Sequence, residues 1–527
     1  MARWVLGAAI GVAVTPVMGQ LLGQNLFPSN SPWNQDISDA PVATNSASII
    51  AAIKGTTKIH PDWGDDSPAN GTSPLYGIPY NVVHGNSTPK VSVIIDDYPG
   101  ESDIVPAPIP TNAVIEGDYQ NGPNTNGPGY NTNQRGDSHL IIWDEDNNVG
   151  YEFYGAARPS DTNTIDETPH TDGKWHAAQE TVWNYNTNDF RPLGYTSADA
   201  AGLSILAGLV RPDEGLPVSQ GGQGAINHAL RMTLPSSIVS HQYIYPASHI
   251  VTATGHLPFG SRLRLKNTSA VNALIATMGP ESQIVAHAMQ HYGLILADIG
   301  SSMYVTGASA AVNSTNGISL VWNMDDILGG LEQLTATNFD VVNLTPAVTN
   351  LSQSSGVTGS ALTINGYNFS GAAGHISVFF GTNAAPAANV LSDSQISVAV
   401  PPGAGTVNVT VQSGLYEPDT YDGLGANVNE PIFGYGVSAT NASDRFTLIP
   451  EPEFQAISAS HGKIIASGTY SGSSGGTYHV MASTNLLVPL ANWLVLTNGS
   501  FGSNGNFSFT NAISSTNARL FYLLRMP

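Results

Sequence analysis

The chain has 527 residues, no cysteine and a formal net charge of −22. The absence of cysteine excludes disulfides, thiolate catalysis and cysteine-ligated metal sites, and the negative charge argues against nucleic acid and anionic membranes as partners. A length near three average domains, with only 11% charged residues and 55 glycines, is typical of an extracellular β-rich protein.

Residues 1–19 form the first recognisable segment. Met-Ala-Arg-Trp is followed by an apolar run from Val5 to Val17 and then by Met18-Gly19, which is the order found in a secretory signal peptide cleaved near Gly19. The run is too short to span a bilayer comfortably, and no second run of about 18 apolar residues follows it. We therefore expect a secreted, extracellular protein with no membrane insertion.

Helical patterns are few in residues 20–344. The sequence predicts helices over Asn45–Ala52, Pro280–Tyr292 and Asn323–Leu334, and the second has proline in its first turn and Gly293 just beyond its end. Short strand-like runs outnumber these helices and show no regular βαβ alternation. An all-β fold follows, and we expect a β-sandwich or jelly roll that carries the catalytic site.

The run from Asp137 to Tyr154 predicts a β-hairpin. Its strands would be Ser138–Trp143 and Val149–Tyr154, joined by a turn over Asp144–Asn148. Alternation along the strands would place Asp137 and His139 on one face, with Glu152 and Tyr154 sharing a face on the return strand. These polar side chains would form the floor of a cleft. The alternative is a half-solvated hairpin that carries no catalytic residues.

Further polar candidates follow the hairpin. Thr196 or Ser197 is expected to cap a short helix with Asp199 in its first turn, where the helix dipole favours a carboxylate. Ile226–Thr233 alternates like a strand, with His228 on one face and Arg231 on the other.

The composition changes at Thr345 to short alternating strands. The elements Thr363-Ile-Asn-Gly-Tyr-Asn-Phe369 and Val378-Phe-Phe-Gly381 resemble those of an IPT/TIG immunoglobulin-like domain, and the resemblance covers residues 345–449. It implies a spacer or binding module without catalysis. Residues 450–527 look like a further small β-sandwich domain.

Residues 30–342 resemble a set of secreted bacterial and fungal proteins to which we attach no activity. The elements that carry this resemblance are Ser31-Pro-Trp-Asn34, Gly136-Asp-Ser-His139, Thr196-Ser-Ala-Asp-Ala-Ala-Gly202, His228-Ala-Leu-Arg231 and Ala297-Asp298. It implies one coherent domain and assigns no catalytic residue.

Three chemistries compete for the polar residues. Paired carboxylates drawn from Glu116, Asp137, Glu152, Asp199 and Glu214 would hydrolyse a glycosidic bond, one as acid and one ionised. A polysaccharide lyase would instead use a general base and an arginine from the set His139, His228, Arg231, Tyr245 and His249. A divalent metal, which neither chemistry requires, would bind Asp137, His139, His228 and His249.

The sequence therefore predicts a monomeric carbohydrate-active enzyme that hydrolyses an extracellular polysaccharide. A lyase is the first alternative, and a non-catalytic adhesin or carbohydrate-binding surface protein is the second. The aromatic side chains expected to stack on sugar rings are Trp143, Tyr154, Trp183 and Tyr245. The catalytic candidates are Asp137, His139, Glu152, Asp199, Glu214, His228, Arg231 and His249.

Overall fold

The computed structural model describes residues 20–65, 75–117, 137–159, 170, 172–308, 322–369, 375–416, 432–471, 476–513 and 519–526. The predicted signal peptide lies outside these ranges. Strands account for 39% of the structure and helices for 15%, which confirms the all-β class. No helix within the described ranges is long and apolar enough to cross a membrane.

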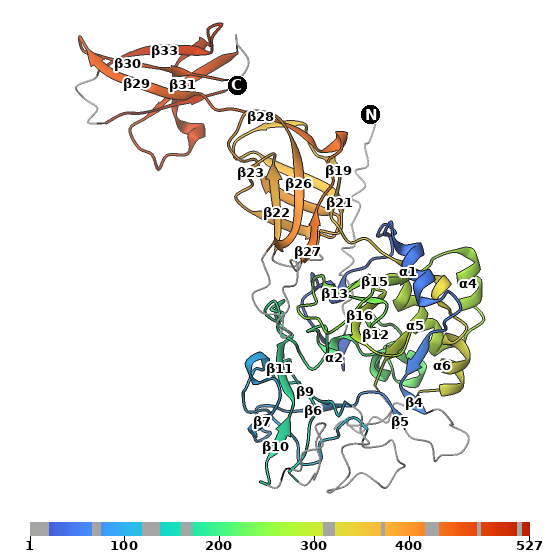
Figure 1. Cartoon of the computed structure of the whole chain (residues 1–527). Coiled ribbons are helices and arrows are strands. Elements are labelled where there is room, and N and C mark those ends of the chain that lie inside the picture. Colours follow the sequence, from blue (N-terminus) through green and yellow to red (C-terminus); the bar gives the residue numbers. More distant parts are fainter. Residues whose placement is uncertain are drawn as a thin grey trace, which may run out of the picture. The chain divides into compact units, whose positions relative to one another are not determined.

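The chain divides into two compact units (Figure 1). The first holds the chain up to Thr345 with the short later segments 370–375 and 413–436, and the second holds the rest of the chain from Pro346 onward. The buried apolar residues of the first unit form a large cluster from Leu21 to Val341 and a smaller one from Val83 to Ala177. Those of the second unit form two clusters, Val348–Leu448 and Ala466–Leu524.

A six-stranded sheet lies at the centre of the first unit. Its order is β18 (Phe339–Val341), β15 (Arg262–Leu265), β16 (Leu294–Ile299), β12 (Leu230–Leu234), β17 (Tyr304–Thr306) and β3 (His60–Asp62). The pairs β12–β16 and β17–β3 are parallel and the other pairs antiparallel. The sheet is thus mixed, whereas the strands of a jelly roll are antiparallel.

Helices pack on this sheet. They are α1 (Ser46–Ile53), α4 (Ser269–Ile275), α5 (Pro280–His291) and α6 (Met324–Leu331), with the one-turn helices α2 (Ile205–Gly208) and α3 (Pro212–Gly215). Helix α5 contacts β15, and α6 contacts both α5 and β3. The three helices predicted from the sequence are confirmed as α1, α5 and α6, each within a few residues of its expected ends.

A second sheet contains the predicted hairpin. Its order is β11 (Gln179–Asn184), β9 (Val149–Tyr154), β8 (Leu140–Asp144) and β6 (Tyr80–Val83). The antiparallel pairing of β8 with β9 confirms the hairpin. Ile141 and Trp143 lie in the large cluster, whereas Leu140 and Ile142 lie in the smaller one. Both faces of the sheet are therefore buried.

Strand β8 begins at Leu140, two residues later than expected. Ser138 has φ of 51°, a left-handed conformation that interrupts an extended strand. The backbone there is fixed by hydrogen bonds from Gly155 N to Asp137 O and from Ala156 N to Ser138 O, both 3.0 Å long. Such strain persists only where the surroundings impose it, and it often marks a functional site.

Four two-stranded sheets complete the first unit. They pair β1 (Gln20–Leu21) with β2 (Gln24–Asn25), β4 (Gly64–Asp65) with β5 (Leu75–Tyr76), β7 (Val93–Ile95) with β10 (Trp175–Ala177), and β13 (Val239–Tyr243) with β14 (Leu257–Phe259).

The second unit contains two pairs of sheets. The first pair is β19 (Ala347–Leu351), β21 (Ala361–Tyr367), β25 (Gln395–Ala399) and β24 (Ala388–Ser392), with β20 (Ser355–Val357), β28 (Arg445–Ile449), β26 (Gly405–Tyr416), β22 (Ile376–Phe380), β23 (Asn383–Ala384) and β27 (Ile432–Val437). The second pair is β29 (Glu453–Ser460), β30 (Lys463–Thr469) and β33 (Asn506–Ala512), with β32 (Leu494–Ser500), β31 (Thr477–Ser483) and β34 (Phe521–Arg525).

The predicted boundaries, 20–344, 345–449 and 450–527, stay predictions of independent folding. A chain ending at Thr345 should fold and melt cooperatively, at the temperature of the corresponding transition in the full chain, because its apolar clusters include no residue beyond Val341. Calorimetry of both chains measures this. Aggregation of the shortened chain under conditions that keep the full chain soluble would contradict it.

Candidate functional site

A cavity of about 270 Å³ opens in the first unit. Five of the residues singled out from the sequence line it, namely Asp137, His139, Tyr154, Asp199 and His249. Its other polar walls come from Tyr98, Gln179, Thr196, Ser197 and Asp298. The volume lies near the lower end of the range for small-molecule sites, roughly 300 Å³.

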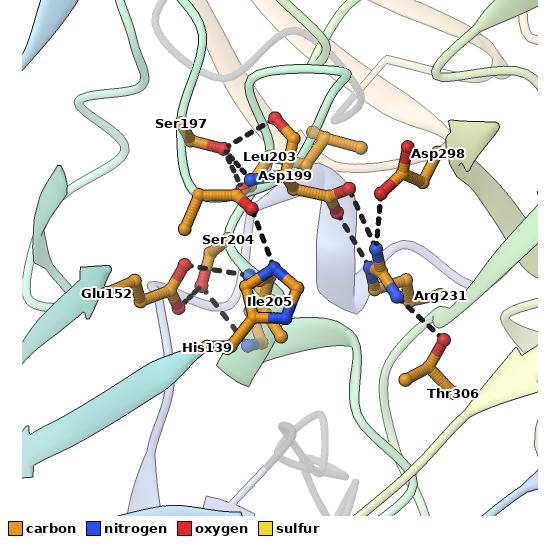
Figure 2. Close-up of polar contacts among 12 residues, drawn as sticks. His139, Glu152, Ser197, Asp199, Leu203, Ser204, Ile205, Arg231, Asp298 and Thr306 are labelled. Carbon is orange, nitrogen blue, oxygen red and sulfur yellow. Dashed lines mark hydrogen bonds and ion pairs between the residues drawn. The ribbon is translucent and has the colours of Figure 1, made fainter. Parts of the chain in front are cut away.

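Arg231 on β12 holds two of the acidic residues that line this cavity (Figure 2). Its Nε and Nη2 donate to the two oxygens of Asp199 at 2.8 and 2.9 Å, and Nη2 also donates to Asp298 Oδ2 at 3.1 Å. Nη1 donates to Thr306 Oγ1 at 2.7 Å. Burial alone would lower the pKa of Arg231, but the Asp199 carboxylate raises it, so the guanidinium is charged.

A β-bulge in β16 brings Asp298 to Arg231. Arg231 pairs with Ile295 and Met232 with Leu296, but Thr233 pairs with Asp298, so that Ala297 is an extra residue. Without the bulge Asp298 would face the opposite side of the sheet, because side chains alternate along a strand. The extra residue also holds the neighbouring loop, since Ala297 O accepts a hydrogen bond from Ala201 N at 3.0 Å.

The segment Thr196–Leu203 forms one wall of the cavity. It is an irregular loop, so the short helix predicted at Thr196 or Ser197 is wrong. Ser197 Oγ lies 2.6 Å from Leu203 O and accepts from Asp199 N at 3.0 Å, which satisfies the loop's polar groups locally instead of through a helix. Gly202 has φ of +70°, and a Cβ there would lie 2.0 Å from Ser248 Oγ.

Side chains from other elements hold the loop from outside. Glu101 Oε2 accepts from Thr196 N at 2.8 Å, and Arg191 Nε donates to Thr196 O at 2.9 Å. The Nδ1 atom of His249 lies 2.9 Å from Ala200 O. The backbone around Asp199 is therefore fixed before any ligand binds.

His139 is a buried cation. Its Nδ1 lies 2.6 Å from Glu116 Oε2, and its Nε2 lies 3.0 Å from Ala198 O. Both partners can only accept, so both ring nitrogens carry protons. Burial would lower the pKa of His139, but the Glu116 carboxylate raises it to about 9. The ring thus links β8 to the loop, and neither nitrogen is available as a base.

The carboxyl groups in the cavity differ in their surroundings. Burial and the neighbouring Asp199 carboxylate raise the pKa of Asp298 to about 8, although Arg231 acts in the opposite direction. Both oxygens of Asp199 accept hydrogen bonds from Arg231, whereas Asp137 is exposed. The cavity therefore contains a carboxyl group with a raised pKa, Asp298, beside an exposed one, Asp137.

Glu152 and Trp183 lie outside the cavity. Glu152 is fully buried and accepts hydrogen bonds from Trp183 Nε1 and Leu206 N at 3.0 and 2.9 Å. It also accepts from Ser204 Oγ and Ile205 N at 2.8 and 2.9 Å (Figure 2). Burial raises the pKa of Glu152. The carboxyl group joins β9 and β11 to the start of α2, which makes it structural.

Glu214 and His228 form a separate buried network. Glu214 Oε1 lies 2.7 Å from His228 Nε2 and 2.9 Å from Arg211 Nη2, and all three residues are at most 2% exposed. His228 does not line the cavity with Asp137, His139 and His249, so the structure does not assemble the predicted metal site.

Trp143 and Tyr245 are fully buried and belong to the core. With Trp183, they are unavailable for stacking on a sugar. The aromatic side chains that line the cavity are Tyr154, as expected, and Tyr98, which is 45% exposed.

Sequence reasoning missed Asp298, Tyr98 and Gln179, and gave Glu116 no role beside His139. Asp298 carried a usable signal, because it directly follows the apolar run Leu294–Ala297 and so comes at the end of a buried strand. Gln179 carried none. Its Oε1 is buried and has no hydrogen-bond partner among the described residues, although the residue lines the cavity.

Comparisons with known proteins identify one part of the chain. Residues 346–423 match the IPT/TIG domain family. Residues 346–423 are thus an immunoglobulin-like IPT/TIG domain, which confirms the resemblance stated above. A search of curated proteins finds no match.

Solved structures resemble the chain only distantly. They include a γ-CGTase from alkalophilic Bacillus clarkii (13% identity, TM-score 0.15, 37% of this chain and 26% of that one). Another is the mixed-linkage glucan utilization protein SGBP-B of Bacteroides ovatus with a mixed-linkage heptasaccharide (13%, 0.14, 36% and 52%). The chain spans about a quarter of the first of these, and TM-scores this low carry no argument about function.

Replacing His139 by Asn should destabilise the protein in a pH-dependent way. The folded pKa of about 9 exceeds the ordinary 6.5, so the stabilisation is fully present below pH 6.5 and is lost as pH rises through 9. The loss in the free energy of unfolding should approach about 3 kcal/mol at pH 6. Denaturant unfolding between pH 6 and 9.5 measures it.

Ile141→Ala is the matched control on the same strand. Ile141 is fully buried and carries no charge, so its loss of roughly 2–5 kcal/mol should not change with pH. Equal pH dependence for the two variants would contradict the charged state of His139.

Proposed function

We propose that the cavity hydrolyses a glycosidic bond of an extracellular polysaccharide, with Asp298 as the general acid and Asp137 as the ionised carboxylate. The single observation that carries this proposal is the pairing of a shielded Asp298 with an exposed Asp137 in one cavity. Glycosidases need one carboxyl group that holds its proton and one that does not.

The surroundings of Asp298 suit an acid. Its Oδ1 accepts from Ile299 N at 2.7 Å and its Oδ2 from Arg231 at 3.1 Å, so the carboxyl group is held in one orientation. Its pKa near 8 supplies a proton at neutral pH. In the reaction that proton passes to the glycosidic oxygen, and the bond from this oxygen to the anomeric carbon breaks.

Asp137 acts at the anomeric carbon in this proposal. Its carboxylate either attacks that carbon or removes a proton from the attacking water. The strained backbone of Ser138 and the hydrogen bond from Gly155 N to Asp137 O fix the residue's position although its side chain is exposed. Near Asp298 a negative Asp137 also favours the protonated acid, since its charge raises the pKa of Asp298.

The same charges favour a neutral sugar over a uronate. The two cations of the site, Arg231 and His139, are already paired with Asp199 and Glu116. Among the described residues of the cavity, a uronate carboxylate would therefore meet acidic groups with neither of these two cations free to pair with it. Tyr98 and Tyr154 offer apolar surface for a sugar ring. Gln179 Oε1, which has no hydrogen-bond partner in the part of the chain that the structure describes, can accept from a sugar hydroxyl.

A lyase has weaker support. Both nitrogens of His139 are hydrogen-bonded to acceptors, and burial together with Asp137 raises the pKa of Tyr154 to about 12. Neither side chain is a ready base at neutral pH. Secretion, predicted from residues 1–19, would bring the proposed enzyme to its polysaccharide.

Asp298→Asn and Asp137→Asn should each lower kcat/KM on a neutral polysaccharide by at least about 100-fold while leaving a folded protein. The wild-type kcat/KM should also fall as pH rises through about 8, because Asp298 then loses the proton it must donate. A panel of polysaccharides, assayed for reducing ends and for unsaturated products, measures both effects.

The control variant is Asp189→Asn, an exposed aspartate outside the cavity, which should keep wild-type activity. Unsaturated products would move the assignment to a lyase. Sugar binding without any product, equal in all four proteins, would favour a binding protein, and full activity of Asp298→Asn would contradict the acid assignment.

A further inference from the structure

A second polar cluster lies outside the cavity, where strands β7 and β10 run side by side. Asp96 follows the last residue of β7, and His176 is the central residue of β10. The ring of His170 stacks on that of His176 with centroids 3.6 Å apart. One ligand-type atom from each of Asp96, His170 and His176 lies within 4.8 Å of the others.

The distances in this cluster match those between metal ligands. Asp96 Oδ2 lies 3.0 Å from His176 Nδ1 and 3.4 Å from His170 Nε2. Two ligand atoms each about 2.0–2.1 Å from a tetrahedral zinc ion are separated by about 3.3 Å. Two of the three separations are close to this value, and the third is within 4.8 Å. Because the two imidazole planes are nearly parallel, one ring must turn for both lone pairs to meet at one ion.

The second nitrogen of His176 is oriented by a carboxylate. His176 Nε2 lies 3.2 Å from Asp172 Oδ1. Histidines that bind metals commonly donate their other N–H to a carboxylate, which fixes the tautomer and directs the free lone pair at the metal. With the proton on Nε2, the lone pair of Nδ1 points to the side where Asp96 lies.

Within the described ranges His170, unlike His176, lacks a hydrogen-bond partner at the nitrogen that faces Asp96. Its Nε2 is buried, and the 3.4 Å approach to Asp96 does not have hydrogen-bond geometry, so the atom has no hydrogen-bond partner among the described residues. A buried nitrogen without a partner costs roughly 1–3 kcal/mol. A metal ion beside Asp96 would supply the missing partner.

We propose that Asp96, His170 and His176 bind a divalent transition-metal ion, with Asp172 orienting His176. Two imidazoles and one carboxylate favour zinc or a neighbouring transition metal over calcium and magnesium, which prefer sites made only of oxygen ligands. Three protein ligands leave a fourth position for water.

The site would stabilise one wall of the cavity. Asp96 N and Tyr98 N donate to Ala177 O and Ala178 O, both at 2.9 Å, so the segment from Asp96 to Tyr98 runs along the residues after His176. Tyr98 lines the cavity. A metal ion joining Asp96 to His176 would add a cross-link within two residues of that side chain.

The test uses the full chain, treated with EDTA and then titrated with zinc chloride by isothermal titration calorimetry. One zinc ion per chain is expected, and His176→Ala and Asp96→Asn should each weaken binding by more than 100-fold. Asp172→Asn, which removes only the orienting carboxylate, should weaken it roughly 10- to 100-fold. Excess calcium or magnesium should not displace the zinc.

The matched control is His291→Ala, because His291 pairs with Asp36 at 3.0 Å and no further histidine or acidic ligand joins this pair among the described residues. It should bind zinc like the wild type. The visible spectrum of the cobalt-loaded wild type reports the coordination without any substitution, and should show bands of a four-coordinate nitrogen and oxygen site. Equal zinc affinity in wild type, His176→Ala and Asp96→Asn, or no binding by wild type, would overturn the proposal.

Discussion

The first unit depends on the burial of one guanidinium between two carboxyl groups. Arg231 is 4% exposed, and an arginine removed from water in this way requires partners for all of its donors. Asp199 comes from a loop, Asp298 from the bulge of β16, and Thr306 from β17. The loop, the bulge and strand β17 are therefore held by the same cation.

That constraint also sets the chemistry of the cavity. Asp199 accepts two hydrogen bonds from Arg231, whereas Asp298 accepts one at a longer distance. Two carboxyl groups that share one cation cannot both be fully compensated, so the less favoured one holds its proton. Burial is the main cause of the raised pKa of Asp298; the neighbouring Asp199 carboxylate adds to it, and the share of the Arg231 charge that Asp298 receives opposes it without cancelling it.

Much of the local structure could be predicted from the sequence. The helix at Pro280 and the hairpin after Ser138 follow from periodicity and capping residues, and the IPT/TIG domain follows from short strand elements. The mixed sheet could not be predicted, because β3 and β17 have only three residues each and pair across more than 200 positions. Strands this short carry no periodic signal.

The candidate site was predictable where polar residues interrupt apolar strands. Asp137 and His139 were found in this way, whereas Asp199 was found from a predicted short helix that the structure replaces with an irregular loop. Glu152 and Trp183 have the same sequence signature, but the structure joins them to each other in the core. Asp298 was missed because simple alternation along β16 does not bring it to the face of Arg231, and nothing in Leu294–Ile299 marks the extra residue.

The bulge at Ala297 makes the site dependent on the length of β16 as well as on its residues. Removing this one codon would make the pairing between β12 and β16 regular and leave Thr233 opposite Asp298, but it would remove the residue whose carbonyl accepts from Ala201 N. All of the acidic residues would still be encoded, and an aligned sequence would still display them. A change of one residue in strand length would therefore alter how the loop that carries Asp199 is attached to the sheet, while the carboxyl group of Asp298 would stay on the face of Arg231.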